Sequence, residues 1–103
     1  MLSLSSRLEG LRDGPYMFLL GDVKLHPGVP GWNHYHPGPT AAYQLEGTTR
    51  HTYGGKVDTE GPESVWFEQV NVHTDTYALG DKPARIIAAL LFPADQPPAI
   101  SVQ

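Results

Sequence analysis

Glycine and proline interrupt this chain at short intervals, and this spacing constrains the fold more than any other feature of the sequence. The 103 residues include 11 glycines and 10 prolines, spread through the chain rather than gathered in one segment. Between them lie short runs rich in apolar, aromatic and β-branched residues, which is the pattern of strands joined by turns. The length allows one domain with one modest core. The sequence therefore predicts a single all-β barrel or sandwich.

Eight of these runs are expected to form short antiparallel strands within a barrel domain at residues 16–97. The last run is apolar on both faces, which predicts burial on both sides or the loss of one face to a subunit interface. Residues 1–15 are predicted to form an N-terminal arm, as a short amphipathic turn, a mobile segment or a strand exchanged with a partner. Residues 98–103 are predicted to form a C-terminal tail that lies across a neighbour. The expected strands are 16–25, 32–36, 40–45, 48–53, 56–59, 65–67, 71–77 and 84–92.

Composition excludes several classes of function. A formal charge of −4 with only seven basic residues argues against a nucleic-acid partner. The absence of cysteine rules out disulfides and thiolate metal sites. The first ten residues lack the basic segment and continuous apolar core of a signal peptide, and the longest apolar run, 86–92, is too short to span a bilayer. We therefore expect a cytoplasmic protein with no membrane partner.

The most informative stretch runs from Gly28 to Gly47, with the sequence GVPGWNHYHPGPTAAYQLEG. His34 and His36 lie two residues apart in an expected strand, so both imidazoles point to the same side, about 6.5 Å apart. The Pro-Gly-Pro turn that follows brings a second strand back beside the first. A third histidine, His73, lies in a later expected strand. The sequence predicts that these three histidines hold one metal ion.

This stretch resembles the first motif of the cupin superfamily, which reads Gly, five residues, His-x-His, three or four residues, Glu, six residues, Gly. The fixed glycines and histidines of that motif match Gly28, His34, His36 and Gly47. The one departure is Thr40, which stands where the family has its glutamate ligand. The resemblance covers about residues 18–97 and implies a double-stranded β-helix, the jelly-roll barrel of that superfamily.

The second cupin motif reads Gly, about five residues, Pro-x-Gly, two residues, His, and it is matched only in part. When the motif is laid on His73, Pro62 takes the place of the first glycine, Glu68 that of the proline and Val70 that of the second glycine. Only the histidine remains, at the expected distance from the first motif. The departures concern the metal site and the turn before the third histidine, not the fold.

Strand alternation predicts which side chains accompany the metal. If parity holds along residues 40–45, Thr40 and Gln44 face the metal and line the substrate pocket, with water in place of the missing carboxylate. Asp75 follows His73 by two residues on the same face, and we expect it to accept a hydrogen bond from an imidazole. His26 is interpreted as a surface residue, and Trp32 and Trp66 as core or interface packing. His51 is interpreted as solvent-facing, with a pocket residue that assists catalysis as the alternative.

Three imidazoles without a thiolate suit one divalent transition metal, whether iron, zinc, nickel, manganese, cobalt or copper. Such a site attracts a small anionic or carbonyl-containing ligand. The resemblance implies a dioxygenase-like enzyme if the metal is iron, whereas zinc or nickel would suit a lyase or isomerase. The alternative is a non-enzymatic cupin that binds or senses a small molecule, which the missing glutamate favours. We expect a homodimer in either case, formed through an apolar sheet face.

Overall fold

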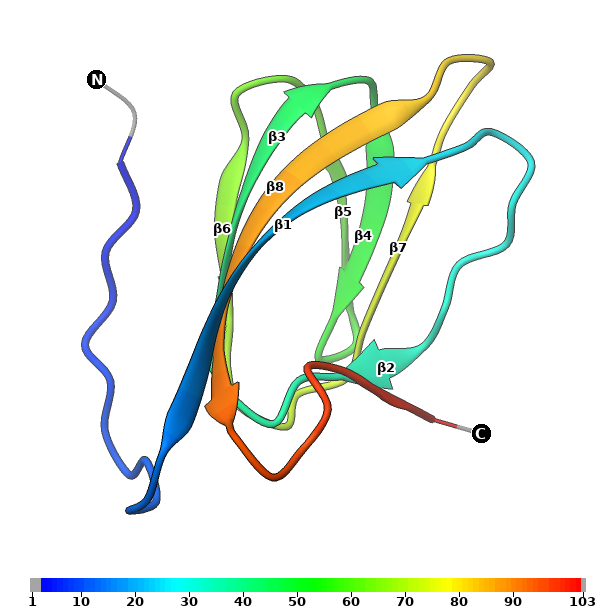
Figure 1. The fold of residues 1–103 in the computed structure, drawn as a ribbon. Coiled ribbons are helices and arrows are strands. Elements are labelled where there is room, and N and C mark those ends of the chain that lie inside the picture. Colours follow the sequence, from blue (N-terminus) through cyan, green and yellow to red (C-terminus); the bar gives the residue numbers. More distant parts are fainter. Residues whose placement is uncertain (1–2, 103) are drawn as a thin grey trace.

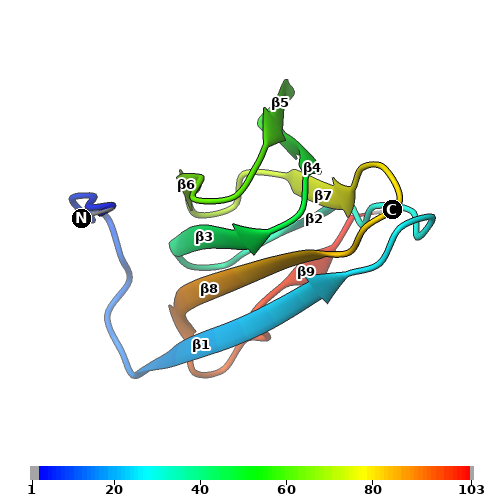
Figure 2. The same cartoon turned by 90° about the horizontal axis from the view of Figure 1, so that it is seen from above.

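The computed structural model describes residues 3–102, and those residues form nine strands and no helix. The strands build two antiparallel sheets that face each other, one of four strands in the order β1-β8-β3-β6 and one of five in the order β5-β4-β7-β2-β9 (Figures 1 and 2). The strands are β1 (Tyr16–Leu25), β2 (His34–Tyr35), β3 (Thr40–Glu46), β4 (Thr49–Tyr53), β5 (Lys56–Glu60), β6 (Val65–Glu68), β7 (Thr74–Ala78), β8 (Ala84–Pro93) and β9 (Ile100–Ser101).

Apart from the β4–β5 hairpin, the strands that pair in both sheets are not consecutive in the sequence, as in a jelly roll. β1 and β8 pair along their whole length, from Tyr16 opposite Pro93 to Leu25 opposite Ala84, and β3 pairs with β8 on the other side. The predicted all-β jelly-roll architecture is confirmed, and seven of the eight expected strands lie within two residues of their predicted limits. No helix among the described residues is long and apolar enough to cross a membrane.

The core lies between the two sheets, and β8 shows how its side chains are divided. Its even-numbered residues from Ala84 to Phe92 are buried, whereas the residues between them are half-buried. The strand is therefore covered fully on one face only. On the outer face of the same sheet Phe18 and Leu20 are 73% and 72% exposed, and Leu4 of the N-terminal arm borders a shallow depression there.

The structure differs from the sequence prediction at three places. β7 begins at Thr74 rather than at residue 71, because residues 69–73 form a turn in which Asn71 takes a φ of 63°. β2 is reduced to two residues. β9 was not predicted, and it pairs with β2, so the segment expected to lie across a neighbour instead adds a strand to the five-stranded sheet of its own chain.

The Pro37-Gly38-Pro39 turn connects the two sheets and fixes where the first ligand strand ends. A side chain at Gly38 would overlap the carbonyl oxygen of Leu91 on β8, so this approach requires glycine. The turn is also tied to β8 by the Leu91 amide, which donates to the carbonyl of Pro39 at 3.1 Å. His36 and Thr40 are thereby placed on opposite sheets at one end of the core.

Candidate functional site

A cavity of about 440 Å³ lies between the sheets, walled by β1 and β8. Its lining is mostly apolar and includes Leu19, Val23, Leu25, Ile86 and Leu90. The polar groups gather at one end, where His34, His36, Thr40 and Glu68 border the same space. An apolar cavity with a few convergent polar groups is the usual form of a small-molecule site.

His34 and His36 both line this cavity, and their rings lie edge to face with centroids 4.9 Å apart. Nδ1 of His34 lies 2.6 Å from the carbonyl oxygen of Trp32, and Nδ1 of His36 lies 2.8 Å from that of Pro98. A carbonyl can only accept, so each Nδ1 carries the hydrogen and donates it. In the neutral rings the lone pairs are therefore on Nε2, the atoms that a metal ion would bind.

Glu68, at the end of β6, is the residue that the sequence analysis missed. It is 6% exposed, and its Oε1 lies 3.2 Å from Nε2 of His36. Its Oε2 accepts from Nε1 of Trp66 at 2.9 Å and lies 3.1 Å from Nε2 of His51 and 3.4 Å from the Thr74 hydroxyl. Strand alternation could have found it. Along β6, Trp66 and Glu68 face the cavity, and Val65 and Phe67 face the other way.

The charges at this end of the cavity depend on one another. Burial opposes ionisation of Glu68, but hydrogen bonds from His36, His51 and Trp66 outweigh it and hold the pKa of the carboxyl well below its usual value. Burial also lowers the pKa of His36, yet the Glu68 carboxylate and the Pro98 carbonyl raise it overall. At His34 burial prevails over the Trp32 carbonyl and lowers the pKa.

Thr40 lies in the cavity as predicted, and it is 3% exposed. It is paired across the sheet with Glu68, so the two side chains are neighbours on the inner face of β3 and β6. Among the described residues its hydroxyl has no hydrogen-bond partner. A buried hydroxyl without a partner costs about 1–3 kcal/mol, so the position holds an unused donor and acceptor.

The structure does not bring His73 to His34 and His36, so the predicted three-histidine site is not formed. His34 is paired with Thr74, which places Thr74 on the cavity side and the preceding residue, His73, on the opposite side. His73 is exposed, and its ring stacks on Tyr35 at 5.8 Å. The cause is the turn through Asn71, which delays the start of β7 from residue 71 to residue 74, so that Thr74 rather than His73 faces the cavity.

Gln44 and Asp75 also lie away from the cavity. Gln44 points inward as parity predicts, but its amide nitrogen donates to the carbonyls of Gly47 and Glu60, and its oxygen accepts from Thr49, so it joins strands rather than meeting a ligand. Asp75 shares the outer face with His73, half-buried beneath Gly31. It accepts no hydrogen bond from a histidine among residues 3–102.

The interpretation of His51 as a surface residue is wrong. It is 4% exposed, and it stands behind Glu68 with its ring 4.8 Å from that of Trp66. Trp66 lines the cavity, whereas Trp32 is 50% exposed and stacks on His34 at 4.3 Å, so Trp32 is not core packing. His26 is exposed, as expected.

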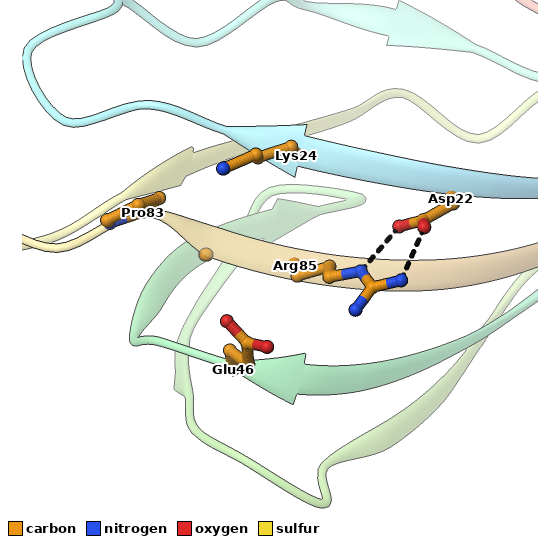
Figure 3. A pocket seen from close by; sticks show the side chains of 6 residues that line it. Asp22, Lys24, Glu46, Pro83 and Arg85 are labelled. Carbon is orange, nitrogen blue, oxygen red and sulfur yellow. Dashed lines mark hydrogen bonds and ion pairs between the residues drawn. The ribbon is translucent and has the colours of Figure 1, made fainter.

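A second depression, of about 300 Å³, lies on the outer surface near the start of β8 and is lined by charged residues (Figure 3). Arg85 there donates from Nε and a terminal nitrogen to the two carboxylate oxygens of Asp22, at 2.9 and 2.6 Å. Lys24 and Glu46 lie at its edges (Figure 3). The charges compensate one another, so this depression offers no strong site for an ion of either sign.

Comparison with known proteins supports the fold by structure alone. No family model and no curated protein sequence matches the chain. An uncharacterised Klebsiella pneumoniae protein with a double-stranded β-helix domain superposes with a TM-score of 0.70 at 16% identity, over 82% of this chain and 70% of that one. A cupin protein from Bacteroides fragilis superposes with a TM-score of 0.63 at 13% identity, over 88% and 86% of the two chains.

Two enzymes have the same fold. Oxalate decarboxylase from Bacillus subtilis has a TM-score of 0.69 at 17% identity over 82% of this chain, which spans only 24% of the enzyme. The polyketide cyclase RemF from Streptomyces resistomycificus has a TM-score of 0.60 at 24% identity, over 84% of this chain and 61% of that one. The protein thus has the double-stranded β-helix fold of the cupin superfamily, as the sequence resemblance predicted.

Proposed function

We propose that this protein binds one divalent transition metal at the polar end of the cavity and uses it to bind a small molecule that has an apolar body and a carbonyl or carboxylate group. The observation that carries this proposal is the orientation of His34 and His36. Both Nδ1 atoms are held by carbonyls, so both Nε2 lone pairs are available in the same cavity. A scaffold without a metal has no need of two imidazoles fixed in this way.

The residues present suit such an ion in chemistry, although their side chains are not assembled around one point. Among residues 3–102 no three His, Asp or Glu side chains form a group ready to hold a metal. Nε2 of His36 and Oε1 of Glu68 are 3.2 Å apart, a distance that suits a hydrogen bond and also suits two ligands of one ion. Two tetrahedral zinc ligands at ~2.1 Å from the ion are about 3.4 Å apart.

The size and lining of the cavity indicate the kind of ligand that it can hold. Its volume and its aliphatic lining accommodate a small apolar body, and its polar end accommodates one charged or carbonyl head group. A metal bound there supplies Lewis acidity or, if it is redox-active, oxygen chemistry. The protein's own side chains orient the head group and exclude water. Oxalate decarboxylase from B. subtilis, one of the structural neighbours, has Mn(II) centres, which makes manganese a metal to test.

Dioxygenase-like chemistry is the enzymatic form of this proposal, and lyase or isomerase chemistry is the form expected with zinc or nickel. A non-enzymatic binding protein is the second candidate. The observation that favours it is that Glu68 has hydrogen-bonding neighbours at both oxygens without any metal.

Metal content tests the proposal. We expect the untagged protein, titrated anaerobically with Mn(II), Fe(II), Co(II) and Zn(II), to retain about one equivalent of at least one metal, measured by plasma mass spectrometry after desalting. His34→Ala and His36→Ala should lose that metal, whereas the exposed His26→Ala and His73→Ala should retain it. Parent protein that retains none of these metals would overturn the proposal and leave the metal-free binding protein as the conclusion.

We also propose that the protein is a homodimer that buries the outer face of the four-stranded sheet. Phe18 and Leu20, which lie on that face, are each more than 70% exposed. Light scattering should give the mass of two chains for the parent and of one chain for Leu20→Lys. A parent mass equal to one chain would refute this assembly.

A further inference from the structure

We infer that Glu68 is the carboxylate ligand of the metal site, in place of the glutamate that the cupin motif has at the position of Thr40. This inference rests on the proposed metal binding and answers which residue completes the ligand set. The geometry points to a carboxylate ligand on β6, at a position directly across from the one on β3 where the cupin motif has its glutamate.

The pairing of β3 and β6 makes this exchange possible. Thr40 and Glu68 are directly opposite each other in the antiparallel pair, and both side chains point into the cavity. Residues opposite each other have Cβ atoms only ~4.5–5.5 Å apart. A carboxylate carried by either residue therefore reaches the same region at the end of the cavity, beside His36.

The two oxygens of Glu68 have different surroundings, as expected of a ligand that the protein orients. Oε2 accepts from Trp66 and lies within 3.1–3.4 Å of His51 and Thr74. Oε1 has His36 as its neighbour, and His36 lines the cavity. Hydrogen bonds that fix one oxygen present the other to the ion, and such contacts behind a ligand tune its affinity.

The contact between His36 and Glu68 gives a second, geometric reason. Nδ1 of His36 donates to the Pro98 carbonyl, so Nε2 is the ring atom that faces Oε1 of Glu68, at 3.2 Å. A divalent ion bound by Nε2 of His36 and of His34 and by Oε1 would take the place of a proton shared by this pair, and it gives two imidazoles and one carboxylate, a set typical of non-haem iron sites.

The residue at position 40 fits this exchange. A second carboxylate opposite Glu68 would place two like charges side by side in a buried site, which is destabilising. Thr40 is neutral and small, and its hydroxyl is left without a partner in the described structure, at a place where a ligand-bound water or a head group can reach it.

Exchanging the two residues tests the inference. Glu68→Gln should lower the affinity for the metal that the parent binds by at least about 100-fold, measured by competition with a chromophoric chelator. The double variant Thr40→Glu/Glu68→Thr should recover affinity to within about tenfold of the parent. In Co(II)-loaded protein the visible absorption should change in Glu68→Gln and return towards that of the parent in the double variant. The matched control is Glu46→Gln, which removes an exposed carboxylate from β3, the strand that carries Thr40. It should change neither the metal affinity nor the Co(II) absorption.

The outcomes separate this inference from the proposed function. No metal in the parent would overturn both. A parent that binds metal and a folded Glu68→Gln that binds it equally well would overturn the role of Glu68 and leave the metal site standing. If Glu68→Gln does not fold, the double variant decides. A folded double variant with parental affinity supports the exchange, and one without metal overturns it.

Discussion

Two buried polar clusters lie between the sheets, and they differ in how well their hydrogen bonds are satisfied. At one cluster Gln44 and Thr49, both fully buried, bond to each other, and the amide of Gln44 also donates to the carbonyls of Gly47 and Glu60. At the other, Oε1 of Glu68 has only Nε2 of His36 as its neighbour, and the neighbouring Thr40 hydroxyl has no partner among the described residues. The first cluster is complete, and the second is not.

This difference indicates that the Gln44–Thr49 cluster stabilises the fold and that the Glu68–Thr40 cluster is suited to binding a ligand. A satisfied buried network stabilises the fold and specifies its register. An incompletely satisfied one stores free energy that a ligand can recover, as is common at binding sites. Alternation along a strand shows which side a residue faces but not which hydrogen bonds it already makes, so Gln44 was predicted to line the pocket although its side chain is fully hydrogen-bonded elsewhere.

The largest effect is expected from breaking the complete cluster. Gln44→Leu removes the side-chain donor to two carbonyls and the acceptor of the Thr49 hydroxyl, so the free energy of unfolding should fall by about 3 kcal/mol. Urea denaturation followed by tryptophan fluorescence measures this change. Gln69→Leu, an exposed glutamine, is the control and should stay within about 0.5 kcal/mol of the parent. A loss for Gln44→Leu no greater than that of the control would contradict the structural role of this cluster.

Metal binding should have an effect almost as large, and only at the incomplete cluster. With free metal at about 100 times its dissociation constant, the free energy of unfolding should rise by about 2.7 kcal/mol. The same rise is expected in Gln44→Leu, whose site is intact, but not in His36→Ala. The measurement is the same denaturation with and without metal. An equal rise in His36→Ala would mean that the metal binds elsewhere.

A smaller effect is expected from Glu68→Gln without metal. The glutamine oxygen still accepts from Trp66, and its amide can donate to the Nε2 lone pair of His36 once that ring is neutral. At pH 8 the free energy of unfolding should therefore change by no more than about 1 kcal/mol. A loss as large as that of Gln44→Leu would show that Glu68 holds the fold together, and would remove the distinction between the two clusters.

The sequence predicted the fold better than the site, for physical reasons. Long apolar strands such as β1 and β8 were found to within one residue, because their alternation and flanking turns determine their limits. His34, His36 and Thr40 line one cavity because they flank the Pro37-Gly38-Pro39 turn, and their roles at a metal stay a prediction. His73 was misplaced because its face depends on the number of residues in the turn before β7, where one residue reverses every side chain. Alternation along β6 turns Glu68 inward, but its position beside Thr40 depends on the register between β3 and β6, which no local pattern reveals.

The smallest expected effect is an increase in the free energy of unfolding, and it is tested by replacing threonine with valine at position 40 and, for comparison, at position 49. Thr40→Val removes a buried hydroxyl that has no partner in the described residues, so without metal it should raise the free energy of unfolding by about 1 kcal/mol. Thr49→Val removes a buried hydroxyl that donates to Gln44 at 2.8 Å, and it should lower that free energy by about the same amount. Both changes keep the side-chain shape, so urea denaturation of the pair isolates the hydrogen bond. If Thr40→Val destabilises the metal-free protein as much as Thr49→Val does, the Thr40 hydroxyl is already satisfied, and the two clusters are alike after all.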